Sequence, residues 1–236
     1  MKTHLKLVLA ALSSLVAAAT CLAIPASYGT ATHSTTEWQE LATYDNNGLV
    51  DEQGVFWSVD NGVTWGREAL SVGQTVKFQF NMHKRNVGTH YADFVKAWID
   101  WNKNGSFDDP SETIIFAKQE LPNVNGSYTP PAPGEADFVF ESGDFTIESF
   151  HIGSLWLRAR VVCSESLNDK RANSVWEDQW DLSDETYNNL FQPTGHLWQG
   201  EVEEHKISVV PDASSTIALL GGALFGLAFF RRQARR

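Results

Sequence analysis

The feature that most constrains the fold of this chain is the alternation of apolar and polar residues in its longest regular segments. In one of them, Val76, Phe78, Phe80 and Met82 alternate with Lys77, Gln79 and Asn81, and residues 155–162 and 206–209 repeat the pattern. Successive side chains of a strand point to opposite faces of a sheet, so a period of two predicts strands. We therefore expect antiparallel sheets with one face in a hydrophobic core and the other in water.

Shorter segments of the same kind lie along the rest of the chain. We predict further strands at residues 55–59, 94–99, 113–117, 137–140 and 145–150, with turns at Asp60-Asn61-Gly62, Asn104-Gly105 and Asn125-Gly126. Two segments interrupt the pattern: a proline-rich loop at 122–134, and a polar stretch at 168–199 in which a short helix is expected after Ser183. Many short strands without helical periodicity predict an all-β fold, a single antiparallel β-sandwich or jelly-roll-like domain.

The C-terminal segment predicts a membrane helix. Residues 214–230 form an apolar run that follows Val210-Pro211-Asp212 and precedes a basic tail ending at residue 236. About 17–25 predominantly apolar residues are needed to cross the bilayer core as a helix. Because basic flanks stay in the cytoplasm, the rest of the chain is expected to lie outside it.

The N-terminal segment, residues 1–26, has the three parts of a secretory signal peptide: a basic start, an apolar stretch and small residues near its end. We predict cleavage after Ala26, with Ala23 as the alternative site. Residues 27–209 then have the size of one domain. They are followed by the C-terminal segment 210–236.

The exported part is strongly acidic. The whole chain has a net charge of −11, and the charged residues removed with its two ends are mainly basic. Such a surface disfavours nucleic acid and favours divalent cations. Only Cys163 remains after the signal peptide, so no internal disulfide can form, and we expect it to be a small buried side chain. The chain has no G-x-S-x-G, H-E-x-x-H or P-loop motif, and we expect no enzymatic activity.

One segment has the spacing of a cation site. Asp100, Asn102, Asn104, Ser106 and Asp108 place an oxygen at every second residue, with a glycine after the third. Calcium takes six to eight oxygen ligands, and a tight turn of the D-x-N-x-N-G kind points several of them inward. We predict a Ca²⁺ site formed by the side chains of Asp100, Asn102, Asn104 and Asp108 and the backbone carbonyl of Ser106, completed by Asp109 or Glu112.

The same residues allow a second interpretation. Asn and Asp side chains also cap turns by accepting hydrogen bonds from nearby backbone N–H groups. The loop is not an EF-hand, because its twelfth position is Ser111 instead of glutamate and the residues before Asp100 predict a strand. A calcium site and a capped turn therefore both stay open.

Two segments resemble known families. The motif Gly200-Glu201-Val202-Glu203-Glu204, with the W-I-D-W-N block at 98–109 and the L-R-A-R-V strand at 157–161, resembles the GEVED domain of secreted bacterial proteins. The C-terminal segment resembles the PEP-CTERM sorting signals, in a variant that begins with Val210, Pro211 and Asp212. These resemblances imply a β-sandwich on a surface, adhesive or matrix protein, an exosortase-type membrane protease as partner, and no reaction.

Glu201 and Glu203 fall on one face of the last predicted strand. Two carboxylates on one face repel each other unless a cation or an arginine lies between them. We expect them either to join the ligands of the Asp100 loop or to pair with Arg158 and Arg160, and the sequence leaves both arrangements open.

Two non-catalytic functions follow. The first is an exported protein of the bacterial cell surface, outer envelope or extracellular matrix. Its C-terminal helix would anchor it transiently in the inner membrane, and its calcium-binding sandwich would contact polysaccharide or surface proteins. The alternative is a carbohydrate-binding module in which exposed tryptophans stack on sugar rings. Trp176, Trp180 and Trp198 are the predicted platform, and Trp57 and Trp65 are further candidates.

Overall fold

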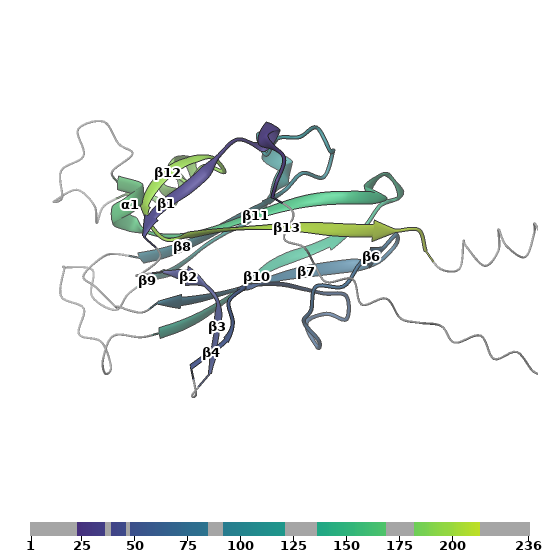
Figure 1. Cartoon of the computed structure of the whole chain (residues 1–236), viewed down its shortest axis with the longest axis horizontal. Helices are drawn as coiled ribbons and strands as arrows, with labels where there is room; N and C mark the ends of the chain where they lie inside the picture. Colours follow the sequence, from purple (N-terminus) through teal and green to yellow (C-terminus); the bar gives the residue numbers. More distant parts are fainter. Residues whose placement is uncertain are drawn as a thin grey trace, which may run out of the picture.

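Two β-sheets packed face to face form the centre of the molecule (Figure 1). The computed structural model describes residues 23–35, 39–45, 48–84, 92–120, 136–168 and 182–212. The larger sheet has the order β6 (Leu70–Ser71), β13 (Glu201–Val210), β11 (Gly153–Cys163), β8 (Ala92–Ile99) and β9 (Thr113–Glu120). In the smaller sheet, β7 (Thr75–Lys84) pairs on one side with β10 (Ala136–Thr146) and on the other with β2 (Glu40–Leu41) and β5 (Val55–Ser58).

The facing sides of these sheets enclose the main core. Val76, Phe78, Phe80 and Met82 of β7 meet Leu155, Leu157, Ala159 and Val161 of β11 in one buried cluster. The other side of β7 carries half-buried polar residues, as the alternation predicts. The central pairs β7–β10, β11–β13, β11–β8 and β8–β9 are all antiparallel. The predicted all-β antiparallel sandwich is confirmed.

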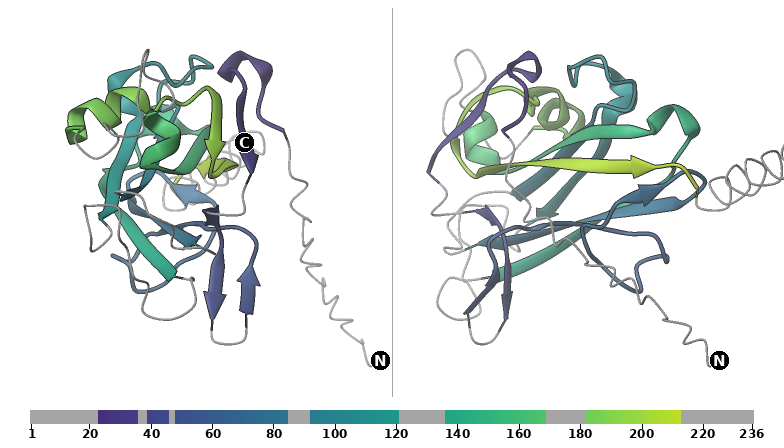
Figure 2. Two further views of the ribbon diagram at one scale, coloured as in Figure 1. Left: turned by 90° about the vertical axis from the view of Figure 1, so that its left-hand side faces the viewer. Right: turned by 45° about the vertical axis from the view of Figure 1, so that its right-hand side comes forward.

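A third layer covers the other face of the larger sheet. It consists of η1 (Ala26–Tyr28), β1 (Ala31–Thr35) paired in parallel with β12 (Gly195–Gln199), and the helices α1 (Ser164–Asn168) and α2 (Asp184–Leu190) (Figure 2). A second buried cluster fills the space beneath it. The expectation that this face of the sheet lies in water is therefore wrong for β8 and β11, where Arg158 and Arg160 are fully buried. Trp98 and Val162 on the same face are the apolar signals of this burial in the sequence.

Three buried cations attach the third layer to the sheet. Lys96 donates to the carbonyl oxygens of Asn188 (2.8 Å) and Phe191 (2.9 Å), at the end of α2. Arg158 and Arg160 donate to carbonyl oxygens of η1, β1 and the segment 192–195. Burial, followed by the charge of Arg158, lowers the pKa of Arg160 to about 9. A buried charge is tolerated when hydrogen bonds satisfy it, so these side chains fix where the outer segments lie.

The remaining elements are short. A hairpin of β3 (Thr43–Asp45) and β4 (Gly48–Asp51) projects from the smaller sheet, and η2 (Pro110–Glu112) and η3 (Ser149–His151) are single 3-10 turns. The helix expected after Ser183 is present as α2, and the Ser183 hydroxyl accepts a hydrogen bond from Thr186 N–H at its start. A strand at 145–150 was a wrong prediction, because β10 ends at Thr146 and η3 follows. The proline-rich loop at 122–134 lies outside the described residues.

Candidate functional site

The predicted calcium loop connects β8 to η2 and is built on Asp100. This carboxylate is fully buried and accepts hydrogen bonds from the Tyr28 hydroxyl (2.6 Å), Asn104 N–H (3.1 Å) and Gly105 N–H (2.9 Å). Gly105 has a φ of +83°, which a residue with a side chain rarely adopts. Asp100 therefore both bends the loop and ties it to η1.

The next side chains of the loop repeat one local contact. Asn102 Oδ1 accepts from Asn104 N–H (2.9 Å), Asn104 Oδ1 from Ser106 N–H (2.8 Å) and Ser106 Oγ from Asp108 N–H (3.3 Å). Each bond joins a side chain to the backbone two residues on, as in Asx and Ser/Thr turns. The capped turn is thus confirmed. A carbonyl or carboxylate oxygen has two lone pairs, so these bonds leave acceptor capacity in the loop.

Glu112 closes the loop from the other end. It completes a capping box at η2, in which Glu112 Oε2 accepts from Asp109 N–H (3.3 Å) and the Asp109 carboxylate from Ser111 N–H (3.3 Å). The Glu112 side chain is fully buried, and its second oxygen, Oε1, has no hydrogen-bond partner. Burial, opposed by the hydrogen bond from Asp109 N–H and assisted by the charges of Asp100, Asp109 and Asp108, raises the pKa of Glu112 to about 7. The loop therefore contains a buried carboxyl group whose ionised form lacks compensation.

The oxygen donors of the loop are of mixed type. Among the described residues, no three or more His, Cys, Asp or Glu side chains are grouped so as to hold a metal ion. A cation at this loop would thus rely on amide and backbone oxygens in addition to Asp100 and Glu112. Calcium accepts such a set, because backbone and Asn carbonyls are among its usual ligands.

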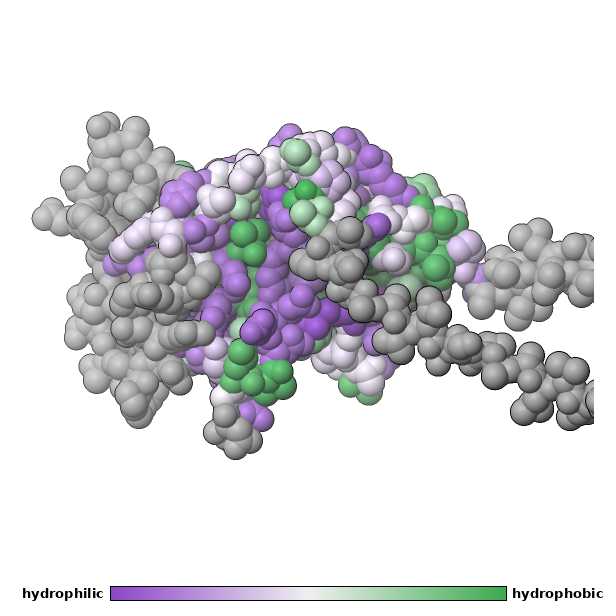
Figure 3. Space-filling model, in the orientation of Figure 1, coloured by the Kyte–Doolittle hydropathy of each residue, from purple (hydrophilic) through white to green (hydrophobic). Residues whose placement is uncertain are grey.

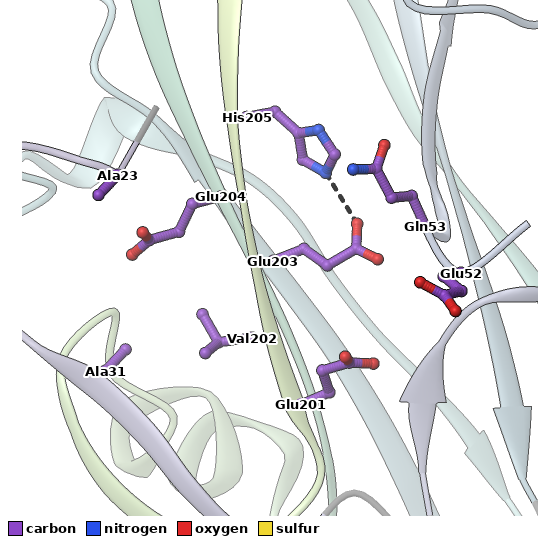
Figure 4. A pocket seen from close by; sticks show the side chains of 9 residues that line it. All are labelled: Ala23, Ala31, Glu52, Gln53, Glu201, Val202, Glu203, Glu204 and His205. Atoms are coloured by element: carbon purple, nitrogen blue, oxygen red, sulfur yellow. Dashed lines mark hydrogen bonds and ion pairs between the residues drawn. The ribbon is translucent and has the colours of Figure 1, made fainter. Parts of the chain in front are cut away.

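A second acidic cavity lies along β13. Glu52, Gln53, Glu201, Glu203, Glu204 and His205 line a cavity of about 380 Å³ together with Ala23, Ala31 and Val202 (Figure 4). Glu203 Oε2 lies 2.7 Å from His205 Nε2, as the dashed line in Figure 4 marks. β13 runs between β1 on one side of this cavity and the segment of Glu52 and Gln53 on the other (Figure 4).

The glutamates of this strand bind backbone groups of the smaller sheet. Glu201 Oε2 accepts from Leu41 N–H (2.6 Å), and Glu203 Oε1 from Gly54 N–H (2.9 Å). The predictions that Glu201 and Glu203 join the calcium ligands or pair with Arg158 and Arg160 are both wrong for the contacts observed. It is Glu204, on the opposite face of the strand, that pairs with Arg158 at 2.5 Å. The two inward glutamates instead hold one sheet against the other.

These residues coincide with a family pattern. A family model of the GEVED domain matches residues 94–208, and one of the VPDSG-CTERM motif matches residues 209–234. The chain carries a GEVED domain followed by a VPDSG-CTERM motif. The GEVED match begins in β8 and ends in β13. It covers every strand of the larger sheet except β6, together with α1, α2 and β12 of the third layer and β10 of the smaller sheet. The two matches make this an exported, surface-associated or secreted protein that is sorted by its C-terminus.

Comparison with other proteins adds little to this assignment. No curated protein matches the sequence significantly. One similar solved structure is the CARDB domain of a Pyrococcus furiosus protein, determined in complex with di-metal ions. Its sequence is 14% identical, the match covers 76% of this chain and 95% of that chain, and the TM-score is 0.31.

The sorting motif begins where the GEVED domain ends. Val210 is the last residue of β13, its carbonyl oxygen accepts from Val72 N–H (3.1 Å), and Pro211 and Asp212 follow without regular structure. The predicted membrane helix at 214–230 lies outside the described residues, as does most of the signal peptide. No helix within the described part of the chain has the length and apolar character needed to cross a membrane.

The predicted tryptophan platform is only partly within the described residues. Trp198 in β12 is 42% exposed, whereas Trp176 and Trp180 lie outside the described residues. Trp57 is 5% exposed and packs in the main core, so it is not a platform residue. Trp65 is half-buried.

Tyr28 is a site residue that the sequence analysis missed. Its hydroxyl bonds to Asp100, and its ring lies 4.8 Å from that of Phe107 in the loop. Ile24 packs against the same cluster. Signal cleavage after Ala23 would keep the Ile24 contact in the mature chain, whereas cleavage after Ala26 would remove it.

Proposed function

We propose that this protein is a non-catalytic module of the cell surface or extracellular matrix, whose GEVED domain binds Ca²⁺ at residues 100–112. The observation that carries the calcium proposal is the buried Glu112 Oε1, which has no partner and lies in the field of three aspartates. Buried polar atoms are almost always hydrogen-bonded, and an exception calls for an explanation such as an ion. A divalent cation would give Glu112 Oε1 a partner and offset the repulsion among the carboxylates.

The proposed ligands are those of the sequence pattern. The side chains of Asp100, Asn102, Asn104 and Asp108, the Ser106 carbonyl and Glu112 would hold the ion. Because the three carboxylates among them are not grouped in the described part of the metal-free chain, the ion would have to draw them together. Calcium would supply charge compensation and rigidity, with no chemical step. Because Asp100 already bonds to Tyr28 and Glu112 directly precedes β9, an ion between them would tie the N-terminal segment to the larger sheet.

A non-catalytic role agrees with the state of the reactive groups. Cys163 donates from its thiol to Gln199 Oε1 (2.7 Å), and burial raises its pKa to about 12, so it is not a nucleophile at neutral pH. Glu201 and Glu203 are occupied by backbone N–H groups, which favours a structural use over acid–base chemistry.

Calcium binding is tested with the full chain purified in detergent, by calorimetric titration and thermal unfolding with calcium or EGTA. Calcium at 100 times its Kd should add about 2.7 kcal/mol of stability. Asp108→Asn should weaken binding, and Asp144→Asn, an exposed aspartate on the smaller sheet, should not. If calcium leaves the wild-type unfolding curve unchanged, the loop is a capped turn and nothing more.

We further propose that an exosortase-type protease recognises Val210, Pro211 and Asp212 while a helix at 214–230 holds the chain in the inner membrane. In producing cells, mass spectrometry of the released protein should find a C-terminus near the motif. The double variant Pro211→Ala, Asp212→Ala should stay in the membrane fraction. Equal release of the variant and the wild type would contradict this sorting route.

A further inference from the structure

We propose that an aromatic cavity beside the 100–112 loop binds uncharged sugar rings. Its volume is about 390 Å³, which is within the range of small-ligand sites. Its aromatic lining consists of Trp101, Phe145, Phe150 and His151, and its polar lining of Asn102, Ser111 and Thr146. It is separate from the acidic cavity of β13, and it uses none of the three tryptophans predicted as a platform.

The four rings form a contiguous surface. The Trp101 ring lies 5.5 Å from that of Phe145 and 5.0 Å from that of His151, and the Phe150 ring lies 4.2 Å from that of His151. Phe150 is 65% exposed and Ile152 beside it is 43% exposed. Figure 3 shows hydrophobic surface at the end of the sandwich where β10 runs into β11. Phe150 and Ile152 thus add adjacent exposed apolar surface beside the rings, and contiguous apolar surface of this kind is typical of binding grooves.

The walls of the cavity are fixed before any ligand arrives. Trp101 and Phe145 pack against the main core. Lys103 of the loop donates to the carbonyl oxygens of Phe150 (2.8 Å) and Ile152 (2.6 Å), which joins the loop to the turn at η3. The Nδ1 atom of His151 accepts from Glu148 N–H (2.9 Å). A preformed site loses little conformational entropy on binding.

The lining selects a neutral ligand. Within the described part of the chain, His151 is the one titratable side chain that lines this cavity, although the protein as a whole is strongly acidic. Burial, followed by the charge of Lys103, lowers the pKa of His151, so its imidazole is uncharged at neutral pH. An ionic ligand would find no counter-charge here.

The combination of rings and short polar groups favours a sugar over an apolar peptide. One face of a pyranose ring presents C–H groups with partial positive charge, which suit the negative face of an aromatic ring. The hydroxyl groups at its edge can bond to the amide of Asn102 and the hydroxyls of Ser111 and Thr146. Asn102 and Ser111 are held in place by hydrogen bonds to the Asp109 carboxylate, and their remaining hydrogen-bonding capacity would be unused beside an apolar peptide.

This inference rests on the surface role proposed above; the cavity shares Asn102 with the proposed calcium site, but none of its four rings belongs to that site. The test uses the full chain in detergent, with neutral hexasaccharides as probes: cellohexaose, laminarihexaose and maltohexaose. Binding is followed by tryptophan fluorescence and calorimetry, with calcium and again with EGTA. We expect at least one probe to bind with a Kd on the order of 0.1–1 mM, within the range of weak specific ligands.

Exposed residues provide matched variants that should fold normally. Phe150→Ala should weaken binding about tenfold, because it removes one stacked ring. Phe150→Tyr keeps the ring and should bind as the wild type does. Trp198→Ala removes an exposed ring elsewhere on the surface and should have no effect.

Several results would overturn the inference. The sugar site would be refuted if the wild type bound none of the probes at millimolar concentration, if Phe150→Ala bound as tightly as the wild type, or if Trp198→Ala abolished binding. Sedimentation should find a monomer. If it finds a dimer that Phe150→Ala dissociates, the aromatic surface is an interface between two copies of the chain and the sugar site is refuted. Sugar binding that persists in EGTA, without stabilisation by calcium, would support this site and refute the calcium site alone.

Discussion

Replacing Glu112 by glutamine tests whether a buried, uncompensated charge exists in the calcium-free loop. Burial raises the pKa of Glu112 to about 7, against its usual 4.5. Because the folded value is the higher one, the unfolded chain loses its proton first as the pH rises from 4.5 to 7. The group therefore contributes stability below pH 4.5 that is lost by the time the pH has passed 7.

The size of the effect follows from this difference in pKa. It corresponds to about 3 kcal/mol between pH 4 and pH 8, and to about 1–2 kcal/mol if water reaches the ionised carboxylate. Glutamine keeps the length of the side chain and an oxygen that can cap η2, but it carries no charge. Without calcium, Glu112→Gln should therefore be more stable than the wild type at pH 8 and similar to it at pH 4.5.

The assay is urea unfolding followed by tryptophan fluorescence, at several pH values, with EGTA or calcium. In calcium the order should reverse at pH 8, because only the wild type retains the carboxylate that binds the ion. Without calcium, the difference in unfolding free energy between the wild type and the variant should change between pH 4.5 and pH 8. A constant difference would refute a buried ionisable Glu112. A calcium effect of equal size in both proteins would remove Glu112 from the ligand set.

Three further outcomes are expected. In urea unfolding, Gly54→Ala should destabilise the domain by about 3 kcal/mol or more, because the new Cβ would lie 2.3 Å from the Asn81 carbonyl oxygen. The control Gly143→Ala, whose Cβ would have no atom within 4 Å, should change the unfolding free energy by no more than about 0.5 kcal/mol. Arg160→Met should cost about 2–4 kcal/mol and speed limited proteolysis near residues 192–195, whose carbonyls lose their donor; unchanged cleavage would contradict the clamp. The Cys163 thiol should react with a disulfide reagent at pH 8 only after unfolding, because it is fully buried and its pKa is about 12; rapid reaction of the native protein would disprove this.

The local pattern of the sequence predicted the long strands of the sandwich, but not the short strands β1 to β4, β6 and β12, and not what covers each strand. β7 and β11 show the same alternation, yet the polar side of β7 is half-buried while Arg158 and Arg160 on β11 are inaccessible. Alternation indicates only that the two faces of a strand differ in polarity. It does not report that a third layer will cover one of them, because that layer is built from short, irregular segments without a periodic signal.

The candidate site divides in the same way. The spacing from Asp100 to Asp108 predicts both the turn and its capping, since these contacts span two to five residues. The partners that decide its charge balance, Tyr28 and the buried position of Glu112, depend on contacts across the fold. The aromatic cavity could not be predicted, because Trp101 follows β8 and Phe150 lies in η3, and only the fold brings both to one cavity.

By itself, the sequence determined that the chain forms an all-β sandwich, that it is exported and that its C-terminus directs its sorting. These properties depend on periodicity, on hydrophobic runs and on short motifs, all of which are local. Only the tertiary structure decided what the glutamates of the GEVED strand do. Both sequence-based interpretations gave Glu201 and Glu203 a cation or an arginine as partner. In the fold, Glu203 contacts His205, and both carboxylates accept hydrogen bonds from the backbone N–H groups of Leu41 and Gly54. Those donors belong to the opposite sheet, more than 140 residues away, and backbone groups leave no trace in the residue pattern.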